Sequence, residues 1–516
     1  MQAHKWLYGG VALLLAGAVQ AEVFSNAATS DIAYGQGERM ASMRCKDLLS
    51  SSDFDFTIIS AIEVAATAEV PAHCRIDGLI PTEIRFETNL PLAWNGRLYM
   101  YGNGGLAGTP AIDAAKQLSR DQALAHHFVT AYTDTGHDKR VHPGGTFAHN
   151  NFHRLVDYGF RAVHLTVQAS KQIAQQFYAH KVDYSYWNGC STGGRQAMIS
   201  AQRFPADFDG IIAGAPAADY SGLKFSQAAR VAAITDADLD EAEINELAKH
   251  IYARCDSLDG EQDGLLSDPR LCDFDIQQHL PKCRGKDKVD CFSTQELDAL
   301  ARYYAPVELA GREVYPAMPV GSEVTGVAAG QPTRTGWYPW LFNDQGPVLL
   351  DLLGSDFFRY MVFVEDRPAF DWTEFDFAEE PDNLAEFRRI VDAVDPDLSA
   401  FKQRGGKLLS YFGWADPDIN PLTLLDYHAQ VQAADPAVDD YFRVFMMPGM
   451  FHCRGGAGPD RFDAMTPLIN WVEGGSAPDS FDTWQLSAQQ QRTAIRPTCA
   501  HPKRAHKSEK GYICKE

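Results

Sequence analysis

The chain has 516 residues and a mass of 57.0 kDa, and its 68 acidic residues outnumber its 46 basic residues to give a net charge of -22. Proteins that bind nucleic acid need basic surfaces, so this composition excludes an ordinary nucleic-acid-binding protein. Hydrophobic residues make up 45% and charged residues 22%, which is typical of a folded globular protein and excludes a disordered or fibrous one. The length predicts two or three structural units, or one large domain with a long insertion.

The first 21 residues have the pattern of a secretory signal peptide. Lys5 precedes an apolar run from Trp6 to Val19, and the small residue Ala21 supplies a cleavage site. The run is short for a bilayer span, although a membrane anchor is the alternative, and no later stretch approaches that length. We therefore expect residues 1–21 to be removed and the mature protein to be secreted or periplasmic, without a membrane partner.

All ten cysteines follow this segment. An even number of cysteines in an exported chain predicts disulfide bonds rather than free thiols or a zinc site. Counting cannot determine the pairing, but closeness in the sequence favours Cys45–Cys74, Cys255–Cys272, Cys283–Cys291 and Cys499–Cys514. Cys190 and Cys453 are left over.

From Gly96 onward, short apolar runs alternate with amphipathic stretches, which predicts an α/β fold. In chain order we expect a strand at 97–101, a strand at 128–132, a helix at 151–178, a strand at 184–187, a helix at 194–204 and a strand at 210–213. After a long interruption we expect a strand at 407–412, a helix at 422–434, a strand at 441–447 and a helix at 460–474.

The interruption has a different composition from its flanks. It is acidic and irregular, and it contains four of the ten cysteines. We interpret residues 218–400 as a lid domain inserted into a catalytic domain made of residues 22–217 and 401–516.

A candidate nucleophile lies in the sequence Gly-Cys-Ser-Thr-Gly at 189–193, which fits the pattern Gly-x-Ser-x-Gly. The pattern alone is common, but here it follows an expected strand and precedes an expected helix, which is the context of a nucleophile elbow. The sharp turn would expose the oxygen of Ser191 at the helix N-terminus, and the flanking glycines leave room for the backbone. The alternative is an ordinary glycine-rich turn.

A nucleophilic serine needs a base and an acid, and in α/β-hydrolases the chain order is Ser, acid, His. Asp416 lies on the loop after the first expected strand that follows the interruption, and His452 lies on the loop after the next one. Asp418 is the alternative acid, and either aspartate could instead cap the helix expected near Pro421. We predict a triad of Ser191, Asp416 and His452 on an α/β-hydrolase fold.

The two unassigned cysteines flank these candidates, because Cys190 precedes Ser191 and Cys453 follows His452. If the serine and histidine come within hydrogen-bond reach, their neighbours come within disulfide distance. We therefore predict a Cys190–Cys453 bond. Closing so long a loop would stabilise the fold by about 4–5 kcal/mol in the chain-entropy model.

Ester hydrolysis also needs N–H donors for the tetrahedral oxyanion. One candidate is the backbone of Thr192, directly after the nucleophile. The other is the run Gly-Asn-Gly-Gly at 102–105, which follows an early strand as oxyanion loops do, with Gly104 or Gly105 as the expected donor. A phosphate-binding loop is the alternative, but no Gly-Lys-Ser/Thr ending follows.

Acidic residues recur at 255–265, within the expected lid. Closely spaced carboxylates on a glycine-bearing loop suit calcium, which takes six to eight oxygen ligands. The loop is not an EF-hand, because the twelfth position counted from Asp259 is Arg270 rather than glutamate. Backbone carbonyls, for example those of Glu261 and Leu265, would have to complete a site. The alternative is a solvated acidic turn.

The sequence resembles the tannase and feruloyl esterase family over most of its mature length. The resemblance rests on Gly-Cys-Ser-x-Gly-Gly-Arg at 189–195, Gly-Trp-x-Asp at 413–416, His452-Cys453, and Tyr-Pro-x-x-Pro-x-Gly-Ser-Glu at 315–323. It implies the predicted triad, a disulfide beside it, and a structural calcium ion in the lid. The ligands that it implies are Asp256, Asp259, Glu261, Asp263 and Leu265.

We therefore expect a secreted serine esterase of the feruloyl esterase type that hydrolyses esters of hydroxycinnamic or hydroxybenzoic acids through an acyl-enzyme on Ser191. The substrate is expected to be a small aromatic ester, which could be attached to a plant polysaccharide or polyphenol. A tannase or a hydrolase of terephthalate half-esters is the alternative within the class. A calcium-stabilised polyphenol- or carbohydrate-binding protein without turnover, or a serine peptidase, is the alternative outside it.

Substrate specificity would lie in the lid. Four aromatic residues of this region could stack on an aromatic acyl group or form the core of the lid: Trp337, Tyr338, Trp340 and Phe342. Arg334 could pair with a substrate carboxylate or be a solvated surface residue.

Overall fold

The computed structural model describes residues 23–237, 239–284, 290–323, 336–342, 348–487, 491–509 and 511–516. The expected signal peptide and Arg334 lie outside the described residues. None of the helices described is both long and apolar enough to cross a bilayer.

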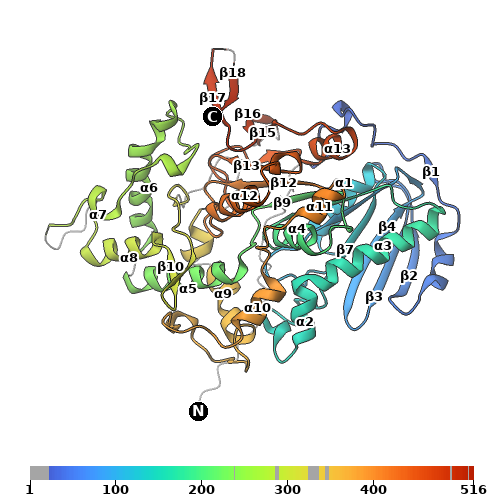
Figure 1. Ribbon diagram of the computed structural model, residues 1–516, viewed down its shortest axis with the longest axis horizontal. Helices are drawn as coiled ribbons and strands as arrows, with labels where there is room; N and C mark the ends of the chain where they lie inside the picture. The colour runs from blue at the N-terminus through green and yellow to red at the C-terminus, as the bar shows by residue number, and fades with distance from the viewer. Residues whose placement is uncertain are drawn as a thin grey trace.

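A nine-stranded mixed β-sheet forms the centre of the molecule, in the order β13-β12-β9-β8-β6-β7-β4-β3-β2 (Figure 1). Neighbouring strands are parallel from β13 to β7 and antiparallel from β7 to β2. Because helices cover both faces, the parallel strands β7 and β9 are buried along their whole length. The strands are β2 (Thr57–Val64), β3 (His73–Ile80), β4 (Ile84–Pro91), β6 (Arg97–Tyr101), β7 (Val129–Thr133), β8 (Tyr184–Cys190), β9 (Gly210–Gly214), β12 (Lys407–Gly413) and β13 (Phe442–Met447).

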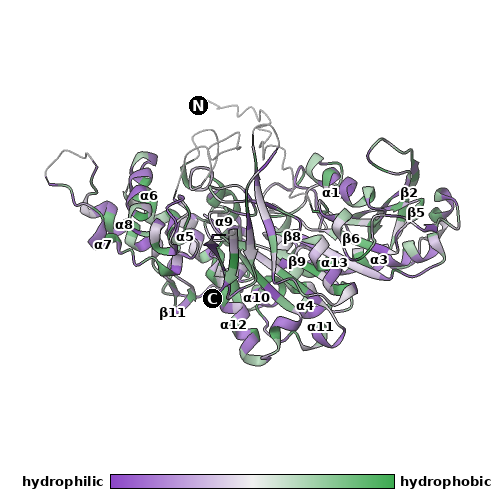
Figure 2. Ribbon diagram, turned by 90° about the horizontal axis from the view of Figure 1, so that it is seen from above, coloured by the Kyte–Doolittle hydropathy of each residue, from purple (hydrophilic) through white to green (hydrophobic). Residues whose placement is uncertain are grey.

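Two hydrophobic clusters lie on the two faces of this sheet. On one face, α3 (Ala162–Tyr178), α4 (Thr192–Arg203) and α12 (Leu422–Ala434) pack into the largest cluster. On the other face, α1 (Ala114–Ala125) and α13 (Met465–Gly474) pack into a second cluster. Outer helices such as α12 carry both hydrophilic and hydrophobic residues, as expected for helices with one buried side (Figure 2).

The α/β alternation predicted from the sequence is confirmed, and most bounds differ by only a few residues. The helix expected at 151–178 is α2 (Phe152–Val156) and α3, joined by a π-helical turn at Asp157–Arg161. The strands β2, β3 and β4 lie before the region in which the alternation is recognisable, and no strand was predicted there.

The helix expected at 460–474 begins five residues late. Arg461–Phe462 form the short strand β14, and α13 begins only at Met465. The carboxylate of Asp463 accepts hydrogen bonds from the N–H and the hydroxyl of Thr466, at 2.9 and 2.7 Å, and so fixes a turn before the helix.

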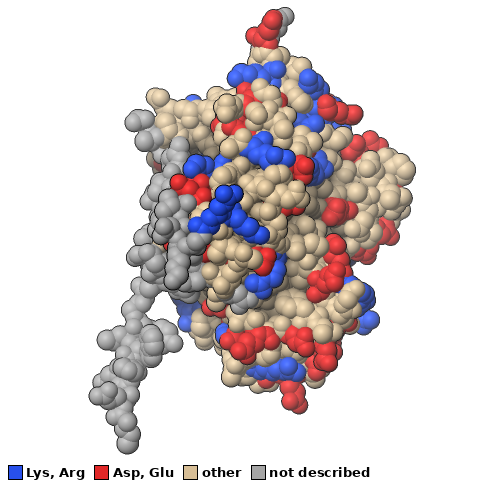
Figure 3. Space-filling view, turned by 90° about the vertical axis from the view of Figure 1, so that its left-hand side faces the viewer, with Lys and Arg blue, Asp and Glu red and all other residues tan. Residues whose placement is uncertain are grey.

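The chain between β9 and β12 is a large insertion. Helices α6, α7 and α8 lie beside the sheet, at the left of Figure 1, and have a hydrophobic cluster of their own, whereas α9 and α10 pack into the largest cluster. On the face that this side of the molecule presents, acidic and basic side chains are interspersed (Figure 3). The elements of the insertion are α5 (Tyr220–Ala237), α6 (Glu241–Cys255), α7 (Ile276–His279), α8 (Thr294–Tyr304), β10 (Val307–Leu309), β11 (Arg312–Tyr315), α9 (Leu349–Tyr360), α10 (Leu384–Val391) and α11 (Ser399–Gln403).

The C-terminal part adds β-structure that the sequence did not predict. Strands β15 (Ser480–Leu486) and β16 (Arg492–Cys499) extend β14 into a small sheet, and β17 (Arg504–Ser508) and β18 (Gly511–Lys515) form a hairpin. Five disulfide bonds are present, and they join the pairs expected from the sequence: Cys45–Cys74, Cys190–Cys453, Cys255–Cys272, Cys283–Cys291 and Cys499–Cys514.

Candidate active site

Ser191 occupies a sharp turn between β8 and α4. Its backbone has φ 64° and ψ -121°, a conformation that a residue with a side chain rarely adopts. A hydrogen bond of 3.0 Å from its N–H to the carbonyl of Gly214 holds the turn. A Cβ atom on Gly189 would lie 2.7 Å from the backbone of Gly193, so the turn needs glycine at 189. This is the geometry of a nucleophile elbow, in which strain in the turn exposes the serine hydroxyl.

Asp416 and His452 form a buried acid–base pair. Oδ2 of Asp416 lies 2.7 Å from Nδ1 of His452, and the Asp416 side chain is fully buried. Its other oxygen accepts hydrogen bonds from the N–H groups of Asp418 and Ile419, at 2.9 and 3.0 Å. Because a carboxylate accepts from Nδ1–H, the other ring nitrogen, Nε2, is left to accept a proton from a nucleophile.

The alternative acid, Asp418, points elsewhere. Its carboxylate accepts a hydrogen bond of 2.7 Å from the side chain of Gln227, and its backbone carbonyl accepts one from Arg230, also at 2.7 Å. Neither aspartate caps α12, because the side chain of Asn420 accepts the hydrogen bond from the N–H of Leu422. The structure therefore brings Asp416, and not Asp418, to His452.

The surroundings of His452 favour its protonated form on balance. Burial, the largest single effect, lowers the pKa, but the charge of Asp416, the hydrogen bond to it and the charge of Asp418 together raise the pKa above 6.5. The ring of Trp340 stands edge-on to the imidazole, with ring centroids 5.4 Å apart. The proton affinity of His452 is thus set by burial and by two nearby carboxylates, of which Asp416 has the larger effect.

A disulfide joins the loop of the base to the turn of the nucleophile. The Cα atoms of Cys190 and Cys453 are 6.0 Å apart, so the adjacent residues Ser191 and His452 are held on neighbouring loops. In the structure the imidazole of His452 is hydrogen-bonded through Nδ1 to Asp416. A serine–histidine bond that tightens only with substrate is common in serine hydrolases.

The glycine-rich run after β6 lies directly on the elbow. A Cβ atom on Gly102 would stand 2.7 Å from the Cα of Gly193, so the two backbones touch. The hydroxyl of Thr192 donates a hydrogen bond of 2.5 Å to the carbonyl of Gly105. The two predicted sources of oxyanion donors, Thr192 and the run that includes Gly104 and Gly105, are therefore in contact.

Gly104 faces open space, which makes it a direct probe of this loop. A Cβ atom there would meet no atom within 4 Å, whereas Gly105 has φ 54° and would bring its Cβ to 3.3 Å from Leu353. We expect Gly104→Ala to fold with an unchanged or slightly higher melting temperature, but to lower kcat on an ester by about 10- to 100-fold by crowding the oxyanion site.

Gly105→Ala is the matched comparison. The backbone at position 105 has a positive φ, so alanine there should lower the melting temperature in addition to kcat. Wild-type kcat and KM in Gly104→Ala would contradict the placement of the loop beside the reacting carbonyl.

The acidic loop at 256–265 folds around its own carboxylates. Asp256, Asp259 and Asp263 each accept a hydrogen bond from a backbone N–H of the loop, at 2.9 to 3.2 Å. Burial raises the pKa of Asp263, and although Arg496 lowers it, the nearby charges of Asp259 and Glu261 raise it further. Negative charges therefore lie close together here, and a bound cation would reduce the repulsion between them.

The side chains alone do not complete a metal site. In the described part of the chain, no three His, Cys, Asp or Glu side chains converge closely enough to hold a metal ion. The carboxylate of Glu261 is held by Lys507 at 2.7 Å, so its backbone carbonyl is the group left for a ligand. The loop fits calcium only if the carbonyls of Glu261 and Leu265 contribute, as the sequence predicted.

The four aromatic residues singled out in the sequence have different surroundings. Trp337 is fully buried and packs on Tyr303, and Phe342 packs against the cluster of α6 and α8. Tyr338 and Trp340 are buried in one π-helical turn, Tyr338–Phe342, and the ring of Trp340 contacts that of His452. Trp337 and Phe342 thus belong to the core of the insertion, whereas Trp340 lies beside His452.

Sequence reasoning missed the residues that support these groups from other elements. Gln227 and Arg230 of α5 hold Asp418, and Gln196 of α4 holds Asn103 of the glycine-rich run. These contacts join residues 93 to 191 positions apart, and no local motif signals them.

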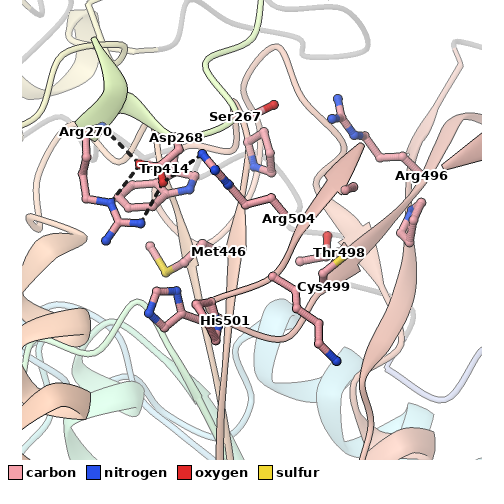
Figure 4. Close-up of a pocket in the computed structure, with 15 residues that line it drawn as sticks. Ser267, Asp268, Arg270, Trp414, Met446, Arg496, Thr498, Cys499, His501 and Arg504 are labelled. Atoms are coloured by element: carbon pink, nitrogen blue, oxygen red, sulfur yellow. Dashed lines mark hydrogen bonds and ion pairs between the residues drawn. The ribbon is translucent and has the colours of Figure 1, made fainter. Parts of the chain in front are cut away.

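A separate pocket lies between the insertion and the C-terminal strands (Figure 4). It contains none of the predicted triad residues, although Trp414 borders it from the loop of Asp416. Its basic side chains are already engaged, since Arg270 and Arg504 both contact Asp268, at 2.7 and 3.6 Å. This pocket is therefore not the predicted reaction site.

Comparison with known proteins identifies the family. A family model described as tannase and feruloyl esterase matches residues 68–515. The chain is 32% identical to the mono(2-hydroxyethyl) terephthalate hydrolase of Piscinibacter sakaiensis, over 88% of this chain and 85% of that protein. It is 30% identical to a probable feruloyl esterase B-1 of Aspergillus flavus, over 78% of this chain and 77% of that protein.

A solved structure agrees with this match. The crystal structure of feruloyl esterase B from Aspergillus oryzae superimposes with a TM-score of 0.77 at 26% identity, and the match covers 91% of this chain and 99% of that one. The protein is a carboxylic ester hydrolase by class. The chain belongs to the tannase and feruloyl esterase family.

Proposed function

We propose that the protein is an exported serine esterase of the α/β-hydrolase type that cleaves esters of hydroxycinnamic or hydroxybenzoic acids. The observation that carries the proposal is the Asp416–His452 hydrogen bond of 2.7 Å on a loop that a disulfide ties to the Ser191 turn. Nucleophile, base and acid on three adjoining loops are the parts that acyl transfer needs.

In the proposed reaction, the hydroxyl of Ser191 attacks the ester carbonyl while Nε2 of His452 takes its proton. Asp416 stabilises the imidazolium, and the N–H groups of Thr192 and of Gly104 or Gly105 hold the oxyanion. His452 then returns the proton to the leaving alcohol, which leaves the aromatic acid esterified to Ser191. Water, deprotonated by His452, releases the acid and restores the serine.

The substrate class rests on the relatives and on one contact. The relatives are a terephthalate half-ester hydrolase and feruloyl esterases by name, and all act on esters of aromatic acids. Trp340, edge-on to His452, offers an aromatic surface where an acyl ring would lie. The alcohol part of the natural substrate could be a plant polysaccharide or polyphenol.

A panel of three esters tests this proposal: methyl ferulate, methyl gallate and mono(2-hydroxyethyl) terephthalate, with release of the acid as the readout. We expect turnover of at least one, and the preferred ester defines the subclass as feruloyl esterase, tannase or terephthalate half-esterase. Turnover of none of them, together with binding of the free acids, would instead support a binding protein.

The insertion is proposed to act as a lid. Residues 218–400 would cover the Ser191 turn, and the catalytic domain would comprise residues 22–217 and 401–516. Support comes from the ring contact of Trp340 with His452 and from Leu353, which lies 3.3 Å from where a Cβ atom on Gly105 would stand, because both bring insertion residues to the predicted site. Export is supported by the five disulfide bonds, which persist in oxidising compartments.

A structural calcium ion is proposed in the loop at 256–265. Its ligands would be the carboxylates of Asp256, Asp259 and Asp263 and the carbonyls of Glu261 and Leu265. Calcium of this kind would hold the loop by neutralising three carboxylates and would take no part in the reaction.

Removing calcium is therefore expected to lower the melting temperature of the protein. Ligand present at 100 times its Kd stabilises by about 2.7 kcal/mol, so chelation should shift the transition by several degrees. Differential scanning fluorimetry with EGTA and with added calcium measures this shift, and Asp259→Asn should abolish it. Identical melting curves under both conditions would contradict the calcium site.

A further inference from the structure

We propose that Gln196 is a positioning residue for ester hydrolysis, because it clamps the oxyanion loop to the helix that begins at the nucleophile. The inference rests on the proposed function. Gln196 lies in the second turn of α4, and Asn103 lies in the glycine-rich run after β6. Both side chains are almost completely buried.

The two residues are joined by a reciprocal pair of hydrogen bonds. Oε1 of Gln196 accepts from the backbone N–H of Asn103 at 3.1 Å, and Nε2 of Gln196 donates to Oδ1 of Asn103 at 3.0 Å. One glutamine thus fixes both the main chain and the side chain of the loop residue. Because the pair is buried, breaking it leaves polar groups unpaired away from water.

The orientation of each amide follows from its partners. Nδ2 of Asn103 donates to the carbonyl of Thr133 at 3.0 Å and to the hydroxyl of Tyr132 at 2.9 Å. A carbonyl can only accept, so Nδ2 must face Thr133 and Oδ1 must face Gln196. The hydroxyl of Tyr132 in turn donates to the carbonyl of Thr109 at 2.8 Å. The network is therefore satisfied in one orientation only, from α4 through the loop to β7.

This network decides which amides of the loop remain for the substrate. The N–H of Asn103 is occupied by Gln196, so the next amides, those of Gly104 and Gly105, are the ones left to donate. The other expected donor, the N–H of Thr192, is on α4 itself, four residues before Gln196. The clamp therefore sets the distance between the two halves of the oxyanion site.

The test compares Gln196→Met, which keeps the length of the side chain and removes both hydrogen bonds, with the wild type. Loss of an oxyanion donor lowers kcat by about 10²- to 10³-fold, so we expect kcat to fall by about 10²-fold with little change in KM. Ser200→Ala is the matched control. It removes another buried hydrogen bond of α4, to the carbonyl of Gln196, without touching the loop, and kcat should stay unchanged.

A second readout separates positioning from loss of stability. An arylboronic acid forms a tetrahedral anion on a nucleophilic serine and needs the oxyanion site, whereas the free aromatic acid does not. In Gln196→Met the inhibition constant of the boronic acid should rise by about the same factor as kcat falls, and that of the free acid should stay constant. An equal change in both constants would overturn the proposal.

Asn103→Ala keeps the main-chain hydrogen bond to Gln196, and it is the variant to use for this test if Gln196→Met does not fold. We expect about a tenfold loss of kcat in this variant, with the same divergence between the two inhibitors. Wild-type kcat in either folded variant would overturn the role of the clamp. Failure of the proposed function looks different, because the wild type itself would then neither hydrolyse esters nor bind the boronic acid.

Discussion

Ser191→Ala is expected to lower kcat on the preferred ester by about 10⁶-fold, the size of loss that removal of a serine nucleophile causes in a well-studied serine protease. No other described group at the turn replaces the hydroxyl, and water would have to attack without forming an acyl-enzyme. Alanine tolerates the positive φ of this turn about as well as serine, so the melting temperature should stay near that of the wild type.

Two measurements check this expectation. Rapid mixing with an activated aryl ester should show a burst of alcohol release in the wild type and none in the variant. Mass spectrometry of the quenched wild type should find the acyl group on the peptide that contains Ser191. Retained turnover in a folded Ser191→Ala protein would exclude this residue as the nucleophile.

Asp416→Asn is expected to lower kcat by about 10⁴-fold and to move the acid limb of the pH profile. The large loss follows because asparagine no longer selects the tautomer of His452 whose Nε2 accepts a proton. Catalysis needs His452 unprotonated, so activity of the wild type should rise with pH through the raised pKa of this residue, above 6.5.

The direction of the shift follows from the causes of that pKa. Asp416 supplies two of the three effects that raise the pKa of His452, and burial, which lowers it, remains in the variant. The acid limb of kcat/KM should therefore move to lower pH in Asp416→Asn. Asp418→Asn keeps the hydrogen bond of 2.7 Å between Asp416 and His452, so its acid limb should move less. An acid limb at the same pH in the wild type and Asp416→Asn would show that the carboxylate of Asp416 does not act on His452.

The parts of the site that could be predicted from the sequence are those with local signals. The strand–turn–helix context predicted Ser191 as the nucleophile, and the position of His452 after the next strand predicted it as the base. The sequence favoured Asp416 as the acid but left Asp418 as an alternative, because both lie on one loop. The contacts that hold Asp418 away from His452 come from Gln227 and Arg230, nearly 200 residues earlier.

The fold shows the same division between local and distant signals. The parallel strands alternate with helices and were recognised, whereas β2, β3 and β4 follow one another without helices and were not. The start of α13 depended on Asp463, whose carboxylate also binds the N–H of Asn26 at the other end of the chain.

The hydrophobic clusters divide the insertion into two parts, and we expect one of them to be easier to replace with the corresponding segment of a related protein. The part around α6, α7 and α8 shares one hydrophobic cluster with the end of α5 and with Trp337, and it carries two disulfides, Cys255–Cys272 and Cys283–Cys291. The part around α9 and α10 shares the largest cluster with α3 and α4, so cutting it out would open the interior beneath the Ser191 turn. A chimera that exchanges 239–304 must therefore match the end of α5 and residues such as Val320 and Trp337, whereas one that exchanges all of 218–400 must carry matching residues on α3 and α4. The segment best suited to grafting is thus smaller than the insertion itself.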